Sequence, residues 1–210
     1  MVIRKGEDIL AGIDDRAIKE IRAKKLAWRY WDDPSELQME QFSAGAAIGL
    51  RILENVDHEA LARIAISILW RAGTSRTVDF RNFNVPESLL ERARETIVGN
   101  MPFDAEVFPI KVFQFVTKGP IHNLTPMNHI LTRPDKKLEP FFRIFANGLV
   151  FHIVDTTVSQ PYDLGEAKWY LGKSDILTVI GFDYHLSAQA EFAASVYSQV
   201  DSFLENRQKH

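Results

Sequence analysis

Three segments in the first third of the chain are predicted to be helices. In the first and the third, apolar residues recur three or four positions apart, the pattern of a helix with one buried face. An Asp or Ser before each segment can accept hydrogen bonds from free backbone N–H groups and so cap the helix. Because the connections are short, we expect the three helices to pack as an antiparallel bundle. The segments are residues 14–31, 35–55 and 57–72.

The rest of the chain has the pattern of a sheet with two further helices. Residues 119–140 hold four Pro residues and a Gly, which favours a long loop of the kind that is often functional or mobile. The further helices are predicted at residues 86–98 and 186–206. Strands are predicted at residues 77–83, 107–117, 141–146, 149–155, 166–171 and 176–183.

Together these elements predict an α+β fold. We expect an N-terminal three-helix bundle packed on a four- to five-stranded antiparallel sheet, with a C-terminal helix. The chain is short enough for a single domain, residues 1–210, divided into a helical subregion at 1–75 and an α+β sheet subregion at 76–210.

The dipeptide Asn147-Gly148 predicts a β-hairpin, because both residue types tolerate the positive φ values of a two-residue type I′ turn. Such a turn fixes the pairing of the two strands. One face of the hairpin is then wholly apolar and belongs to the core. The other is mixed: it carries Arg143 opposite His152 among aromatic and aliphatic side chains. A mixed face of this kind predicts partial cover by a helix or loop and a half-buried pocket.

The next predicted strand adds polar residues to the same face and extends the candidate ligand site. The predicted binding residues are Arg143, His152, Glu166, Lys168 and Tyr170. The two cations can hold an anion, Arg through its bidentate fork, and the His can titrate near neutral pH. The alternative is that Arg143, His152 and Glu166 satisfy one another at the edge of a packed sheet, since structural ion-pair networks resemble sites.

A second hypothesis is catalytic. Asp155 followed by Glu166-Ala167-Lys168 has the residue order of a metal-dependent nuclease, in which two carboxylates hold Mg²⁺ and the Lys positions water. The order occurs often by chance, and the strand parity places Asp155 on the apolar side of its strand. The sequence therefore favours structural roles for Asp155, Glu166 and Lys168 over the catalytic ones.

A third hypothesis is nucleic-acid binding through helix 14–31, which mixes Lys and Arg with Trp and Tyr. A solvated helix anchored by Trp has the same composition.

Two other features can be explained either by a function or by an ordinary structural role. His122 and His129 are either metal ligands or ordinary loop residues, and Asp183 either orients His185 or caps the following helix.

The segment Gly45 to Gly49 would give helix 35–55 a face of small residues. Glycine costs about 1 kcal/mol in a helix, so close approach of another helix or of a second subunit should offset it. A homodimer is therefore one of the expectations.

Composition narrows the remaining choices. The chain has no cysteine, which excludes disulfides, thiolate catalysis and Cys-ligated metals. We expect neither a cofactor nor a resident metal. The net charge is −3, so nucleic-acid binding would need a local basic patch. No secretory signal and no apolar run of about 20 residues is visible, which favours a cytoplasmic protein without a membrane span. The leading hypothesis is a non-enzymatic binding module for a partner protein or a small anion.

Overall fold

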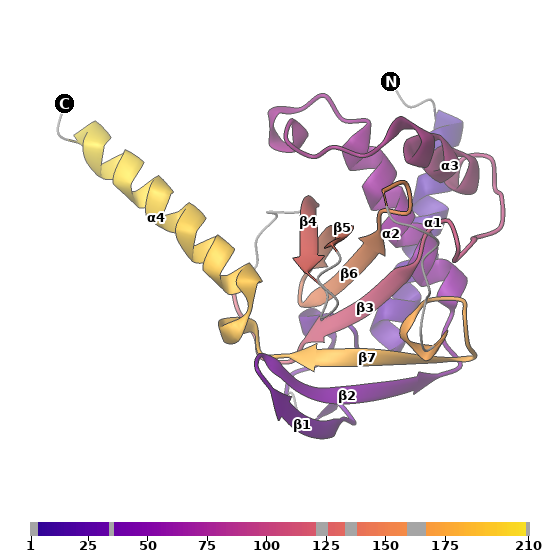
Figure 1. Ribbon diagram of the computed structural model, residues 1–210, viewed down its shortest axis with the longest axis horizontal. Coiled ribbons are helices and arrows are strands. Elements are labelled where there is room, and N and C mark those ends of the chain that lie inside the picture. The colour runs from indigo at the N-terminus through magenta and orange to yellow at the C-terminus, as the bar shows by residue number, and fades with distance from the viewer. Residues whose placement is uncertain (1–3, 34–35, 121–125, 133–137, 159–166, 209–210) are drawn as a thin grey trace.

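The computed structural model describes residues 4–33, 36–120, 126–132, 138–158 and 167–208 of the 210-residue chain (Figure 1). Its centre is a seven-stranded sheet with the strand order β1-β2-β7-β3-β6-β5-β4. Neighbouring strands run antiparallel, except that β3 and β7 pair in parallel. The strands are β1 (Glu40–Ala44), β2 (Ala47–Glu54), β3 (Ile110–Phe115), β4 (Met127–Thr132), β5 (Leu138–Ala146), β6 (Leu149–Val154) and β7 (Ile176–Phe182).

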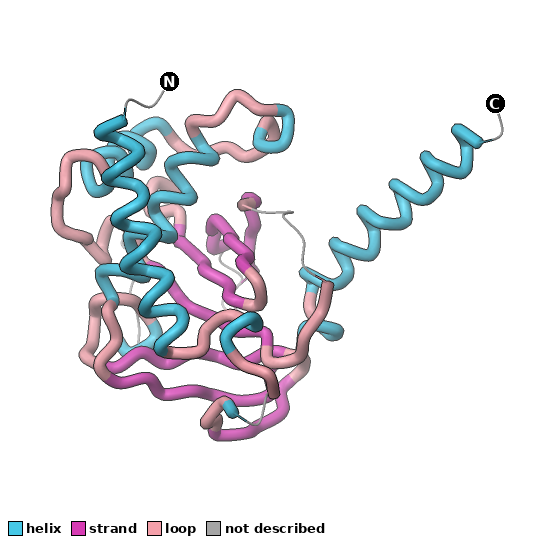
Figure 2. The backbone as a smooth tube through the Cα atoms, turned by 180° about the vertical axis from the view of Figure 1, so that it is seen from behind, coloured by secondary structure: helices cyan, strands magenta, loops and turns pink. Residues whose placement is uncertain are grey.

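Helices cover one face of this sheet. Viewed from behind, α1 and α2 lie across the strands (Figure 2), and α3 packs against α2. The helix α4 instead extends away from the body of the molecule (Figure 1). None of the helices within the described ranges is long and apolar enough to cross a membrane. The helices are α1 (Arg4–Ala23), α2 (His58–Gly73), α3 (Glu87–Ile97) and α4 (Ala188–Gln208), with short 3₁₀ helices η1 (Trp28–Tyr30), η3 (Val78–Phe80), η4 (Ala167–Trp169) and η5 (Tyr184–Leu186).

The main core lies between the helices and the sheet. Ile144, Phe151 and Val179 point from the sheet into this layer, where they meet buried residues of α2 such as Leu61 and Ile66. The α2 helix begins where the sequence predicts, because the Asp57 carboxylate accepts a hydrogen bond from the backbone N–H of Ala60 at 3.0 Å. The predicted helix 86–98 and the predicted strands 107–117 and 176–183 are also confirmed, as α3, β3 and β7.

The hairpin prediction is confirmed in register. Arg143 pairs with His152, Ile144 with Phe151, and Ala146 with Leu149. Asn147 and Gly148 make the turn, with φ values of 53° and 87°. The parity of the strands therefore separates an apolar face, buried under the helices, from a mixed face on the other side of the sheet.

The predicted helix 35–55 is wrong. This segment forms the hairpin of β1 and β2, so the first 75 residues are not purely helical. Gly45 lies in the turn with a φ of 62°, and a Cβ on Gly49 would overlap the Met39 side chain. The small-residue helix face does not exist, and the expectation of a homodimer loses the observation that suggested it. The physical reason is that β2 is hydrogen-bonded on both sides, to β1 and β7, which overrides local propensity.

Other boundaries also differ from the prediction. The first helix, expected at residues 14–31, begins at Arg4 and ends at Ala23. Two residues further on, Lys25 takes a left-handed φ of 49°. The predicted strand at 77–83 is replaced by η3, and the described part of the predicted strand 166–171 begins with η4. The predicted loop 119–140 contains β4 and the start of β5. The strands that the sequence did not predict, β1, β2 and β4, bring the sheet to seven strands rather than four or five. The coarse prediction of an α+β fold dominated by antiparallel pairing is confirmed. The prediction that residues 1–210 form one domain stays a prediction.

Candidate functional site

The mixed face of the sheet is partly covered, as the hairpin pattern predicts. At one end, Trp28 and Tyr184 pack on Phe145 and Phe115 in a second apolar cluster, separate from the main core. Toward the other end, the buried Tyr170 has its ring 4.9 Å from the Nζ atom of Lys111. The segments that cover this face lie far from the hairpin in sequence. A space remains between these segments and the sheet.

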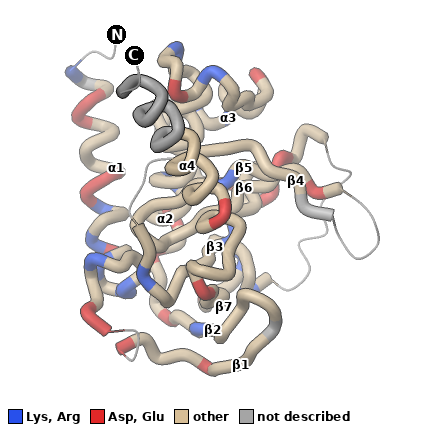
Figure 3. Tube along the Cα trace, turned by 90° about the vertical axis from the view of Figure 1, so that its left-hand side faces the viewer, with Lys and Arg blue, Asp and Glu red and all other residues tan. Residues whose placement is uncertain are grey.

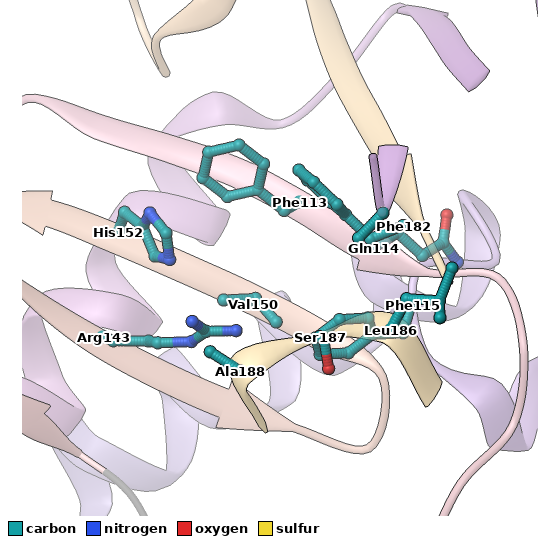
Figure 4. Close-up of a pocket in the computed structure, with 11 residues that line it drawn as sticks. Phe113, Gln114, Phe115, Arg143, Val150, His152, Phe182, Leu186, Ser187 and Ala188 are labelled. Carbon is teal, nitrogen blue, oxygen red and sulfur yellow. The ribbon is translucent and has the colours of Figure 1, made fainter. Parts of the chain in front are cut away.

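That space is a pocket of about 170 Å³. It lies between the strands β3, β5 and β6 and the chain that leads from β7 into α4 (Figure 4). Most of its lining is apolar, and Arg143 and His152 supply ionisable groups. The lining residues are Ala46, Phe113, Gln114, Phe115, Arg143, Val150, His152, Phe182, Leu186, Ser187 and Ala188.

Arg143 has an unusual position for a cation. Its Nε atom is buried, and no acceptor lies within hydrogen-bonding distance of it in the part of the chain that the structure describes. Burial lowers the pKa of its guanidinium to about 10, so the group remains charged at neutral pH. The side chain points along the pocket toward the segment that holds Ser187 and Ala188 (Figure 4). A charged guanidinium therefore faces an apolar space.

His152 is held between two aromatic rings. Its ring centroid lies 4.5 Å from that of Phe113 and 4.2 Å from that of Phe141. Burial lowers its pKa well below the usual 6.5, and the nearby Arg143, His129 and Lys111 lower it further. Its Nε2 atom is buried and has no partner among the described residues. The imidazole is therefore neutral at pH 7, and the surrounding groups attract negative charge.

The buried histidines should make the fold sensitive to acid. An unfolded His has a pKa of about 6.5, whereas burial lowers the pKa of both His152 and His58 in the folded chain. As the pH falls below about 6.5, the unfolded chain takes up protons that the folded chain does not, so the free energy of unfolding decreases. An imidazole that stays neutral contributes a loss of up to about 2 kcal/mol at pH 5. Urea unfolding at pH 7.5, 6 and 5 measures this loss.

Two variants locate the effect. His152→Phe keeps an aromatic ring between Phe113 and Phe141, and should lose less stability than the wild type between pH 7.5 and pH 5. His185→Phe alters an exposed imidazole and should behave as the wild type does. An unchanged pH dependence in His152→Phe would show that the imidazole titrates alike in the folded and unfolded chains.

No family model, curated protein or solved structure matches this chain. Any function assigned to the pocket therefore depends on the geometry and chemistry of its own residues.

Lys168 and Tyr170, two other predicted binding residues, do not line the pocket. Tyr170 lies beside Lys111, and Lys111 pairs with His152 across β3 and β6 and forms an ion pair with Glu139 at 3.8 Å. Lys168 is exposed on η4, with its Nζ 5.9 Å from the Trp169 ring. Glu166 lies outside the described residues. Of the predicted constellation, the structure brings Arg143 and His152 together, with Tyr170 near them.

The described residues of the nuclease hypothesis, Asp155 and Lys168, are not arranged as metal ligands. Asp155 is buried, and its Oδ1 atom accepts hydrogen bonds from the backbone N–H and the hydroxyl of Thr157. Among the described residues, no group of three His, Asp or Glu side chains could hold a metal ion. His129 stacks on Phe141, with ring centroids 5.1 Å apart, and His122 lies outside the described residues.

The basic helix hypothesis also finds little support. Trp28 and Trp31 are buried and cannot stack on bases. Arg16 forms a bidentate ion pair with Asp57, and Lys25 pairs with Glu36. Figure 3 shows acidic positions among the basic ones along α1. The prediction that Asp183 acts as a cap fits the structure, because its Oδ1 accepts from the backbone N–H of His185.

Sequence reasoning missed most of the pocket wall. Phe113 and Phe182 come from β3 and β7, and the segment 186–188 closes the opposite side. The alternation along β3 is visible in the sequence, but the pairing of β3 with β6 is not. Leu186 in the closing segment is 64% exposed, which only the structure shows.

Proposed function

We propose that this protein is a non-enzymatic binding module for a small anion, which it takes up in the Arg143 pocket. The observation that carries the proposal is the buried Nε–H of Arg143, which lacks an acceptor among the described residues. A buried donor without an acceptor costs about 1–3 kcal/mol, and a charged group costs more. An anion in the pocket would supply both the acceptor and the counter-charge.

The electrostatic setting supports the same conclusion. Among the lining residues that the structure describes, none is acidic. The groups that act on His152 from β5, β4 and β3 are Arg143, His129 and Lys111, all of which carry or can take up positive charge. An anion therefore meets one full positive charge in a pocket whose lining is mostly apolar.

The polar lining residues favour binding over catalysis. Ser187 is the lining residue with a hydroxyl group among those described, and its Oγ donates to the carbonyl of Tyr184 at 2.6 Å and accepts from the N–H of Ala190. That hydroxyl shapes the start of α4 and is not activated by a base. His152 stacks between aromatic rings without a carboxylate to orient it among the described residues.

A thermal-shift experiment tests the proposal. Acetate, benzoate and inorganic phosphate are each added at constant ionic strength, with chloride as the reference. A bound anion at ten times its dissociation constant should stabilise the wild type by about 1.4 kcal/mol, which raises Tm by about 3–6 °C. Arg143→Met should lose this shift, whereas Arg81→Met, which removes an exposed charge, should keep it. Equal shifts in wild type and Arg143→Met, or none with any anion, would refute the proposal.

A further inference from the structure

We infer that the ligand is a small monocarboxylate with a compact apolar body, bound with its carboxylate on Arg143 and its body against Phe182, Val150 and Leu186. This inference rests on the proposed anion-binding function and narrows it to one class of ligand. Four properties of the pocket lead to it: its division into two ends, its charge, the shape of its donor and its volume.

The pocket has a polar and an apolar end. His152 and Arg143 enter from one side, while Phe182, Phe115 and Leu186 lie at the other (Figure 4). An inorganic ion would fill the polar end and leave the apolar side chains facing water or empty space. A ligand with an apolar body buries that surface as well, which favours binding by about 25 cal/mol for each Å² removed from water.

The charge of the lining matches a single negative charge. Arg143 is cationic at neutral pH, and His152 is neutral because burial disfavours its protonated form. A dianion such as a phosphate monoester would bring a second charge into an apolar space without a partner, and an unpaired buried charge is strongly unfavourable. The pocket should therefore prefer monoanions.

The shape of the donor favours a carboxylate among monoanions. A guanidinium offers parallel N–H groups in one plane, and a carboxylate accepts two of them at once. The Nε–H of Arg143 is buried and lacks an acceptor in the described chain, so a carboxylate that binds through it breaks no existing hydrogen bond. This arrangement orients the carboxylate along the plane of the guanidinium and directs the body of the ligand away from it.

The volume limits the size of the body. A pocket of about 170 Å³ is close to the apolar cavity of about 150 Å³ that is known to take up benzene. A ring or a short branched chain bearing one carboxylate, about six to nine heavy atoms, fits this space. A biphenyl carboxylate or a long-chain fatty acid would extend beyond this space and leave part of its apolar body in water.

Calorimetric titration with matched probes tests the inference. We expect benzoate to bind at least tenfold more tightly than acetate or inorganic phosphate, and biphenyl-4-carboxylate to bind at least tenfold more weakly than benzoate. Benzyl alcohol has a similar body without the charge and should show no measurable binding. Leu186→Ala shortens an exposed apolar residue of the pocket wall, and should weaken benzoate binding three- to tenfold while leaving acetate binding unchanged.

The possible outcomes separate this inference from the function on which it rests. Phosphate or acetate binding as tightly as benzoate, with loss in Arg143→Met, would leave anion binding intact and overturn the choice of a carboxylate with an apolar body. The same holds if Leu186→Ala weakens acetate and benzoate equally. Failure of every anion to bind would overturn both. Benzoate binding that survives in Arg143→Met would also overturn both, because the ligand would then occupy the pocket without using the cation.

Discussion

Replacing Arg143 with Met should stabilise the folded protein by about 1–3 kcal/mol while it removes anion binding. Burial lowers the pKa of this guanidinium by more than two units, to about 10. Each pKa unit corresponds to about 1.4 kcal/mol, so burial disfavours the cation by roughly 3 kcal/mol. Both the folded and the unfolded chain carry the proton at neutral pH, and the full penalty therefore applies there. A Met side chain of similar length fills the same space without it.

Urea unfolding at pH 7.5, in a buffer without added anions, measures this effect. The Arg81→Met variant serves as the control, since it removes an exposed charge and should leave the unfolding free energy within about 0.5 kcal/mol of the wild type. A loss of more than 1 kcal/mol in Arg143→Met would contradict the account. It would mean that Arg143 is a satisfied structural residue, as in the alternative interpretation of the sequence.

Trp28→Ala should destabilise the protein by about 3–5 kcal/mol. The side chain is 4% exposed, and its Nε1–H donates to the carbonyl of Phe115 at 2.7 Å. Its ring packs against Phe145 and Tyr184, with ring centroids 5.8 Å and 5.5 Å away. Its backbone N–H also donates to the carbonyl of Asn147 in the hairpin turn. Trp28 therefore fixes the segment after α1 to the end of the mixed face.

A second variant at Trp28 separates the contribution of packing from that of the hydrogen bond. Trp28→Phe keeps most of the apolar contact and leaves the Phe115 carbonyl without this donor, so we expect a loss of about 1–2 kcal/mol. Both variants are compared with the wild type by urea unfolding at pH 7.5. A loss below 1 kcal/mol in Trp28→Ala would show that the second apolar cluster is not needed to hold the covering segment in place.

The hairpin shows what the sequence could predict. A turn of Asn147-Gly148 permits one register, and that register alone places Arg143 beside His152 on one side of the sheet. The partial cover of this side also follows from the pattern, because aromatic and aliphatic side chains next to a cation cannot be fully solvated or fully buried. The pairing of Arg143 with His152, at the centre of the candidate site, thus follows from the sequence of the hairpin alone.

The errors arise where tertiary pairing decides the structure. The segment 35–55 is rich in small residues and its pattern predicts a helix. It forms a β-hairpin instead, because β2 is hydrogen-bonded to β1 on one side and to β7 on the other. The buried Arg51 donates to Gln114 and to the carbonyls of Lys24 and Lys25, contacts that only the folded sheet creates. The pocket wall was missed for the same reason, since the segment 186–188 reaches Arg143 through the fold and not through the sequence.

The central claim is that the Arg143 guanidinium, whose buried Nε–H has no acceptor among the described residues, binds a small anion in its pocket. A ¹H–¹⁵N spectrum of the arginine Nε–H groups tests it most directly, with the Arg143 signal assigned by its loss in Arg143→Met. As benzoate is added at pH 7.5, this signal should move and then saturate, while the exposed Arg81 signal stays in place. An Arg143 signal that does not move at saturating benzoate, acetate or phosphate would contradict the claim.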